Sequence, residues 1–179
     1  MKAQWVISMV FSGFLCTATF TPAVAQLDHL SGSHNSQAPI EITADTLEVR
    51  NTENLAIFRG DVDAIQGNML LKADMLIVHY RANKETPDQQ GISQIDAEGN
   101  VFVSSPNETA QGARGIYDVD KEKIWLTGQV VLTQGDNIIQ GERLELDLAT
   151  GQSKVLSAAI NDGKRKRVRG LFVPKKQNN

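Results

Sequence analysis

The sequence predicts an all-β domain of antiparallel strands, and three observations carry this prediction. Apolar and polar residues alternate over short segments, which is the period of a half-buried strand. Two short motifs return along the chain with turn residues between them, as in stacked β-structure. Beyond the first 25 residues, no apolar period of 3.6 is long enough for a helix. The 179 residues, 41% of them hydrophobic, suffice for one domain of moderate size.

The first 25 residues have the features of a secretory signal peptide. Met1-Lys2 is a short basic start, a largely apolar run extends from Trp5 to Phe20, and Ala23-Val24-Ala25 supplies small residues for cleavage. The run is shorter than the roughly 20 apolar residues that span a bilayer. We expect cleavage after Ala25, with an uncleaved anchor as the alternative. Cleavage would also remove Cys16, the single cysteine.

A polar segment at residues 26–38 is expected to be a flexible lead-in, and the strand period starts directly after it. Ile40, Ile42 and Ala44 fall on one face of an extended chain. After Asp45 the alternation slips by one residue, as it does at a β-bulge. The sequence therefore predicts a strand that is interrupted by a bulge.

Two motifs repeat in the body of the chain. The apolar pattern of residues 40–49 returns at 69–78 and, more weakly, at 139–146. The second motif is Gly-polar-Val, found at Gly60-Asp61-Val62, Gly99-Asn100-Val101 and Gly128-Gln129-Val130. Residues 81–93 are polar and are expected to be an inserted loop. These repeats predict one domain of many short antiparallel strands.

The alternation assigns one face of each strand to the interior. The residues expected to face inward are Ile40, Ile42, Leu47, Val49, Phe58, Val62, Leu71, Leu76, Val78, Val101, Val103, Tyr117, Val119, Leu144 and Leu146. Two sheets of this kind either close into a filled sandwich or stay apart and leave an apolar trough. The period of the sequence does not separate these two arrangements.

Charge is distributed unevenly along the chain. Residues 26–163 hold ten basic and 21 acidic groups, whereas seven basic residues lie between Lys164 and Lys176. The net charge of −3 argues against a nucleic-acid binder, which needs a basic surface to neutralise phosphates. The basic run is either a solvated tail or a contact for lipid phosphates or an acidic partner.

The residues do not assemble a catalytic or metal site. Gly-x-Ser-x-Gly is absent, two of the three histidines lie in the lead-in, and His79 is expected at an edge or surface. Three acid pairs at i, i+2 spacing are expected to be solvated, namely Asp61/Asp63, Asp118/Asp120 and Glu145/Asp147. We therefore expect no enzyme, no metal and no cofactor.

An ordered set of motifs resembles the OstA-like β-jellyroll family over residues 38–174. The motifs are Pro39-Ile40-Glu41-Ile42-Thr43-Ala44-Asp45, Phe58-Arg59-Gly60-Asp61-Val62, Ala73-Asp74-Met75-Leu76, Tyr117-Asp118-Val119, Leu126-Thr127-Gly128 and residues 167–174. The resemblance implies an open, twisted β-jellyroll of two stacked antiparallel sheets as one domain over residues 39–174, with a tail at 175–179. It also implies a periplasmic protein that binds lipopolysaccharide and carries it from an inner-membrane transporter to an outer-membrane translocon.

The resemblance further implies which residues meet the acyl chains and where partners dock. The lipid-binding residues would be Ile40, Ile42, Phe58, Val101, Val103, Tyr117 and Val119. Partners would be the inner-membrane and outer-membrane components of the transport machinery, bound through the strand from Ile40 and the strand near Leu171 to Val173, with possible head-to-tail self-association. The alternatives are a membrane-anchored component of the same pathway and a structural β-repeat protein without lipid cargo.

Overall fold

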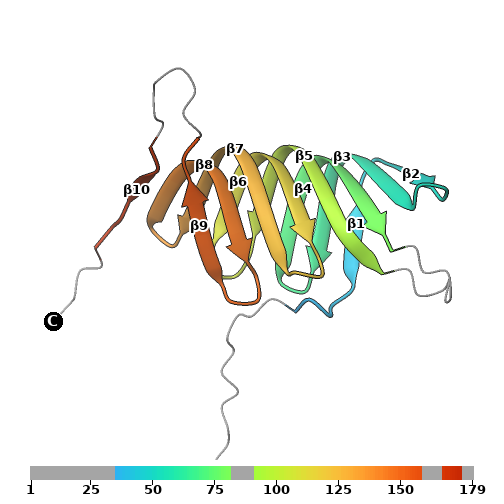
Figure 1. Cartoon of the computed structure of the whole chain (residues 1–179), viewed down its shortest axis with the longest axis horizontal. Helices are drawn as coiled ribbons and strands as arrows, with labels where there is room; N and C mark the ends of the chain where they lie inside the picture. The colour runs from blue at the N-terminus through green and yellow to red at the C-terminus, as the bar shows by residue number, and fades with distance from the viewer. Residues whose placement is uncertain (1–34, 82–90, 159–166, 175–179) are drawn as a thin grey trace, which may run out of the picture.

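The computed structural model of the chain describes residues 35–81, 91–158 and 167–174, which form one antiparallel sheet (Figure 1). The strands in these residues are β1 (Ile40–Thr43), β2 (Thr46–Arg50), β3 (Leu55–Gln66), β4 (Met69–Tyr80), β5 (Ile92–Ser104), β6 (Thr109–Asp118), β7 (Lys123–Gln134), β8 (Asn137–Asp147), β9 (Gln152–Leu156) and β10 (Arg169–Leu171). Within the described residues, no helix has the length and hydropathy needed to span a membrane. The expected signal peptide, most of the lead-in, most of the inserted loop and most of the basic run lie outside them.

Consecutive strands from β3 to β8 pair with one another, and two short strands finish each end of the sheet. β1 and β2 both pair with β3, while β9 and β10 both pair with β8. The central strands run for 10 to 13 residues, so they are longer than the short strands that the sequence predicted. They are longer because each continues through a bend where its register with its neighbours shifts.

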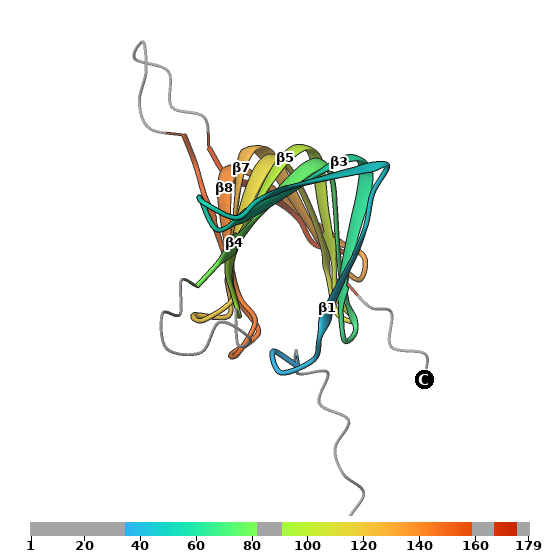
Figure 2. The ribbon, with the colours of Figure 1, turned by 90° about the vertical axis from the view of Figure 1, so that its right-hand side faces the viewer.

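The bends divide the sheet into two facing halves, which we call arm A and arm B. Arm A contains β2, β9 and residues 55–59, 75–80, 92–98, 114–118, 123–127 and 143–147. Arm B contains β1, β10 and residues 62–66, 69–73, 101–104, 109–111, 130–134 and 137–141. Seen end-on in Figure 2, the arms join along the bends and part at the opposite edge. This confirms the predicted all-β jellyroll of antiparallel strands.

The repeated Gly-polar-Val motif forms the bends of β3, β5 and β7. Gly60, Gly99 and Gly128 have φ of +84°, +76° and +86°, and the residue after each also has positive φ. A side chain at these glycines would collide with Asp45, Asp74 or Ala113 of the neighbouring strand. The valine of each motif then points inward and is at most 1% exposed.

The slip predicted after Asp45 is also confirmed. Residues 44 and 45 join β1 to β2 opposite the bend of β3, where the Asp45 N–H donates to the Gly60 carbonyl at 3.1 Å. The same Ala-Asp pair recurs at residues 73–74, where Asp74 accepts hydrogen bonds from the Asn100 amide at 3.0 and 3.2 Å. In both copies of the first repeat, the Ala-Asp pair therefore lies beside a Gly-polar-Val bend of the neighbouring strand.

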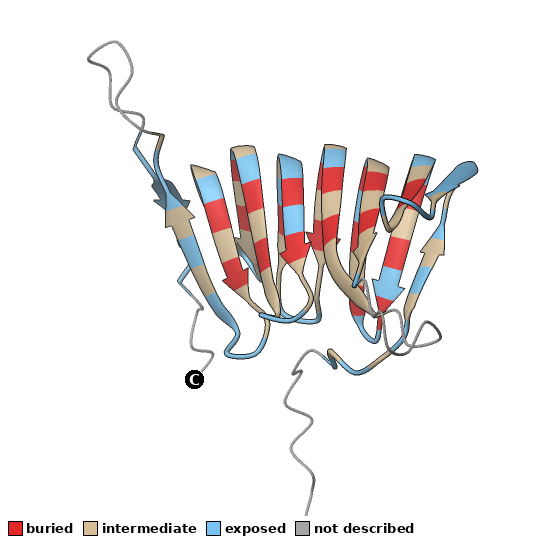
Figure 3. Ribbon diagram, turned by 45° about the vertical axis from the view of Figure 1, so that its right-hand side comes forward, coloured by how far each residue is buried: buried red, intermediate tan, exposed pale blue. Residues whose placement is uncertain are grey.

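Burial follows the predicted alternation along the strands, as the stripes in Figure 3 show. Leu47 and Val49 are exceptions, since they were expected inside yet are 55% and 57% exposed. Leu47 pairs with Phe58 of β3, and Val49 pairs with Ala56. Because both partners face inward, Leu47 and Val49 also lie on the inward face. They stay exposed because β2 is the last strand of arm A and no described residue beyond it covers that end.

Candidate functional site: the apolar interior between the arms

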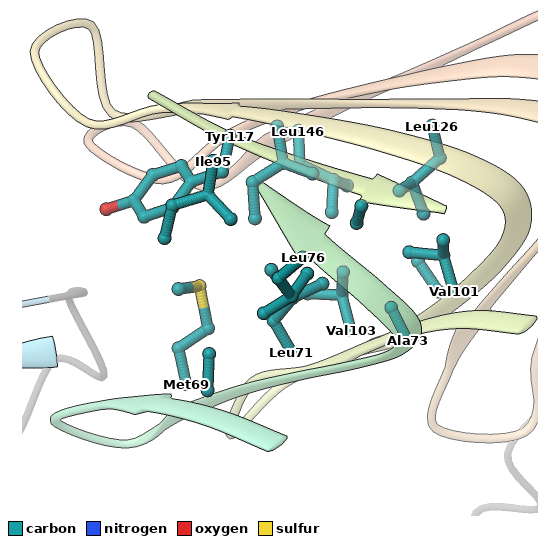
Figure 4. Close-up of a cluster of buried hydrophobic side chains, with 14 of the residues drawn as sticks. Met69, Leu71, Ala73, Leu76, Ile95, Val101, Val103, Tyr117, Leu126 and Leu146 are labelled. Carbon is teal, nitrogen blue, oxygen red and sulfur yellow. The ribbon is translucent and has the colours of Figure 1, made fainter. Parts of the chain in front are cut away.

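Both arms contribute aliphatic side chains to one continuous interior (Figure 4). Leu76, Ile95 and Leu126 come from arm A and are at most 1% exposed, and they belong to the same cluster as Leu71 and Val101 of arm B. Every central strand runs through a bend from one arm into the other. Each strand therefore supplies inward side chains to both arms, and the interior is continuous. Such a surface attracts apolar groups without fixing their direction.

All seven predicted lipid-binding residues belong to this interior. Val101, Val103 and Tyr117 are buried within the core cluster. The other four are half-buried and pack against it, namely Ile40, Ile42, Phe58 and Val119. The structure therefore brings together every residue that the resemblance nominated, and their contact with lipid remains a prediction.

Several interior residues were missing from the predicted inward set. They include Met69, Ile95, Ile124, Leu126, Val130 and Leu132. The sequence did indicate two of these inward segments, because Ile95 and Ala97, like Ile124 and Leu126, are apolar residues spaced two apart, as on one face of a strand. Gln66, which is 2% exposed, gave no such signal, since a polar residue at a strand end is ordinarily solvated.

The interior is filled by the protein's own side chains. The space bounded by Ile40, Met69, Leu71, Ile95 and Tyr117 has a volume of about 0 Å³, so it does not admit a water molecule. Of the two arrangements that the sequence left open, this state is the filled one, and the trough implied by the resemblance is closed. An acyl chain would therefore have to displace these side chains in order to lie among them.

Within the described residues, in contrast, nothing covers the two ends of the interior. At one end Leu47, Val49, Phe58 and Tyr80 line a hollow of about 250 Å³. At the other end Phe172, which follows β10, is 68% exposed. The apolar interior therefore continues onto exposed apolar side chains at both ends of the sheet.

The one aromatic hydroxyl of the core is hydrogen-bonded. The Tyr117 hydroxyl donates to Oε1 of Gln66 at 2.8 Å. Burial raises the pKa of the Tyr117 phenol well above its ordinary value, and the nearby Glu122 carboxylate adds to the shift. The hydroxyl therefore stays protonated and remains a donor at physiological pH.

The outer faces carry the charged residues, and their carboxylates are engaged by lysines. The ion pairs are Asp63 with Lys72 at 2.6 Å, Asp118 with Lys121 at 2.6 Å, and Glu145 and Asp147 with Lys123 at 3.1 and 3.3 Å. Hydrogen bonds to those two carboxylates raise the pKa of Lys123. Four of the six residues in the predicted acid pairs, namely Asp63, Asp118, Glu145 and Asp147, are thus held in ion pairs with lysines on the outer face.

His79 lies on the outer face of the central strand β4, where its Nε2 is 2.8 Å from Oδ2 of Asp96. The expected surface position is therefore correct, although the strand is not an edge strand. Among the described residues, no three His, Cys, Asp or Glu side chains are grouped so as to hold a metal ion.

Comparison with known families adds independent findings. Residues 41–152 match the family model described as LptA/(LptD N-terminal domain) LPS transport protein. An uncharacterised protein of Rhizobium meliloti is 34% identical over 124 residues, which are 68% of this chain and 67% of that protein. The LPS-assembly protein LptD of Salmonella choleraesuis is 34% identical over 77 residues, but these are only 9% of its length.

A full-length relative and a solved structure agree with this match. The lipopolysaccharide export system protein LptH of Pseudomonas aeruginosa is 23% identical over 169 residues, covering 88% of this chain and 91% of LptH. Its crystal structure, described as the LptA-homologous periplasmic component of the lipopolysaccharide transport device, superposes with a TM-score of 0.67 at 21% identity. The superposition covers 79% of this chain and 99% of the LptH structure, so the two proteins share a fold.

Proposed function

We propose that this chain, which belongs to the LPS transport family of LptA and the LptD N-terminal domain, is a periplasmic bridge that carries lipopolysaccharide. It would receive the lipid from an inner-membrane transporter and pass it to an outer-membrane translocon. The observation that carries the proposal is the continuous apolar interior, which runs through both arms and reaches uncovered apolar side chains at both ends. Periplasmic placement rests on the relative LptH and on the predicted cleavage after Ala25.

The physical chemistry of the interior suits this cargo. Removing an acyl chain from water gains about 0.8 kcal/mol per methylene, so about ten methylenes gain about 8 kcal/mol before the cost of parting the arms. The charged sugar head group would stay in water at the open edge between the arms. Because apolar contacts are non-directional, the cargo would shift between neighbouring strands with little change in contact energy.

Site-specific photo-crosslinking tests this function with two adjacent residues of β3. The side chain of Phe58 lies inward and that of Arg59 lies outward. A benzophenone residue at position 58 is expected to form an adduct with lipopolysaccharide, and one at position 59 is expected to form little. Equal labelling at both positions, or none at either, would favour a structural β-repeat protein without lipid cargo.

The free edges of the sheet are the proposed docking sites for partners. Among the described residues, β1 and β2 leave unpaired backbone groups at one end of the sheet, and β9 and β10 do so at the other. The two predicted edges, near Ile40 and near Leu171, are thus both edge strands, and both lie in arm B. Addition of a strand from a similar jellyroll would extend the sheet and join the two apolar interiors end to end.

Phe172→Asp is expected to weaken head-to-tail association, because it places a charge in the apolar junction. In sedimentation velocity over a range of concentrations, the dissociation constant of the assembly should be at least tenfold higher for the variant than for wild type. Ile116→Asp is the control, since Ile116 is 43% exposed but lies on the outer face of the central strand β6. If both variants associate like wild type, the junction does not involve this end of the sheet.

A further inference from the structure

Two hydrogen-bonded bridges cross the open edge between the arms. In the first, Tyr117 near the end of β6 in arm A donates to Gln66 at the end of β3 in arm B, over 2.8 Å. These two residues are 51 positions apart in the chain. The bridge lies beside the filled space that Ile40, Met69 and Ile95 also bound.

Gln66 also fastens the segment that precedes β1. Its Nε2 donates to the carbonyls of Ser36 at 3.0 Å and Ala38 at 3.1 Å, while its Oε1 accepts from Tyr117. Figure 2 shows the turn before β1, in blue, below the opening between the arms. One amide therefore holds three parts of the molecule together at the open edge.

The second bridge lies in the C-terminal half of the sheet. Oε2 of Glu108, in the loop before β6 of arm B, accepts a hydrogen bond from Oγ of Ser153 at 2.9 Å. Ser153 belongs to β9 of arm A, and its partner Leu146 places it on the inward face. Nε2 of Gln134, at the end of β7 in arm B, donates to the same oxygen of Glu108 at 2.7 Å.

The placement of these bridges differs from that of the apolar contacts. The contacts near the bend tie the arms permanently, because every central strand passes through both. At the opposite edge the arms are joined by side-chain hydrogen bonds, of which those to Glu108 are half-buried, whereas Tyr117 and Gln66 are each 2% exposed. Once the arms part, water reaches these groups and replaces the broken hydrogen bonds at small net cost.

We propose that the Tyr117–Gln66 and Ser153–Glu108 bridges are latches, and that lipid enters the interior sideways by parting them. The inference rests on the proposed function, since it concerns how the acyl chains reach the filled interior. Gln66, Tyr117, Glu108 and Ser153 are thus positioning residues that set the population of the open form. Passage only through the uncovered ends is the competing route.

Loading kinetics test the latches with Tyr117→Phe and Ser153→Ala, each of which removes one hydroxyl. Stopped-flow binding of lipopolysaccharide should be about fivefold faster for each variant and about 25-fold faster for the double variant, because each hydrogen bond holds the closed form. Apparent affinity should rise together with the rate, since a larger open fraction lowers the apparent Kd. Damage to the fold would lower affinity instead, so the direction separates the two explanations.

Ser93→Ala is the matched control, because the Ser93 hydroxyl donates to the His79 carbonyl at 3.1 Å within arm A. It should bind lipopolysaccharide at the wild-type rate. Latch variants that load no faster than Ser93→Ala would overturn the proposal and favour passage through the ends. Failure of the wild-type chain to bind lipopolysaccharide at all would instead refute the proposed function.

A distance measurement reports arm opening without reference to rates. Spin labels at Asn68, in the turn after β3, and at Lys121, in the turn after β6, lie on opposite sides of the open edge, with Cys16 replaced by Ser. The separation should increase on adding lipopolysaccharide, and the double latch variant should populate the longer distance without lipid. An unchanged distance in both cases would contradict sideways loading.

Discussion

Ile42→Glu is expected to lower the affinity for lipopolysaccharide about a hundredfold while leaving the chain folded. Ile42 lies on the edge strand β1, half-buried and packed against the core cluster. Without lipid, the new carboxylate can turn toward solvent at this edge. With lipid, it would be desolvated against acyl chains, and an effective cost of about 2.7 kcal/mol corresponds to a hundredfold loss.

Thr43→Glu is the control for this variant. Thr43 is the next residue of β1, lies on the outer face and is exposed. The same charge there should leave binding within about twofold of wild type. The measurement is lipopolysaccharide binding to the purified chain, with circular dichroism to confirm folding. Normal binding by a folded Ile42→Glu protein would mean that the acyl chains do not occupy the interior.

Leu76→Ala is expected to lower the free energy of unfolding by about 3 kcal/mol. Leu76 is 0% exposed, lies in β4 beside the bend and is surrounded by residues of both arms. Truncation loses the transfer free energy of the side chain and leaves a cavity that tightly bonded strands do not collapse to fill. Urea unfolding measures the change, and the midpoint should fall without a change in slope.

Leu47→Ala provides the matched comparison, because it removes the same atoms from a leucine that is 55% exposed on β2. We expect a loss of less than about 1 kcal/mol, as little apolar surface is removed from water there. The two variants together measure how far the interior is filled. Similar small losses for both would indicate that the space around Leu76 is loosely packed.

The bends illustrate what the sequence could predict. The motif at Gly60, Gly99 and Gly128 was visible as a repeat, and the slip after Asp45 was interpreted correctly as a bulge. Both signals are local. A positive φ favours glycine at that position, and a shift of the strand period can be recognised from adjacent residues. The composition and spacing alone did not show that the bends align into one fold line.

The edge strand β2 shows where the local signal misled. Leu47 and Val49 have the period of an inward face, and their register with β3 agrees with it. Their exposure depends on whether another strand follows β2, which is a property of the whole sheet. The same pair is consistent with the proposed docking end, where a partner strand would cover them.

The sequence by itself determined the all-β class, most of the inward and outward faces and the slip after Asp45, because each depends on neighbours one or two residues away. Only the tertiary structure decided that the interior is filled, that no described residue covers either end and that Gln66 meets Tyr117 across the open edge. These features depend on which distant side chains share one space. The alternation along a strand carries no information about the strand that lies opposite.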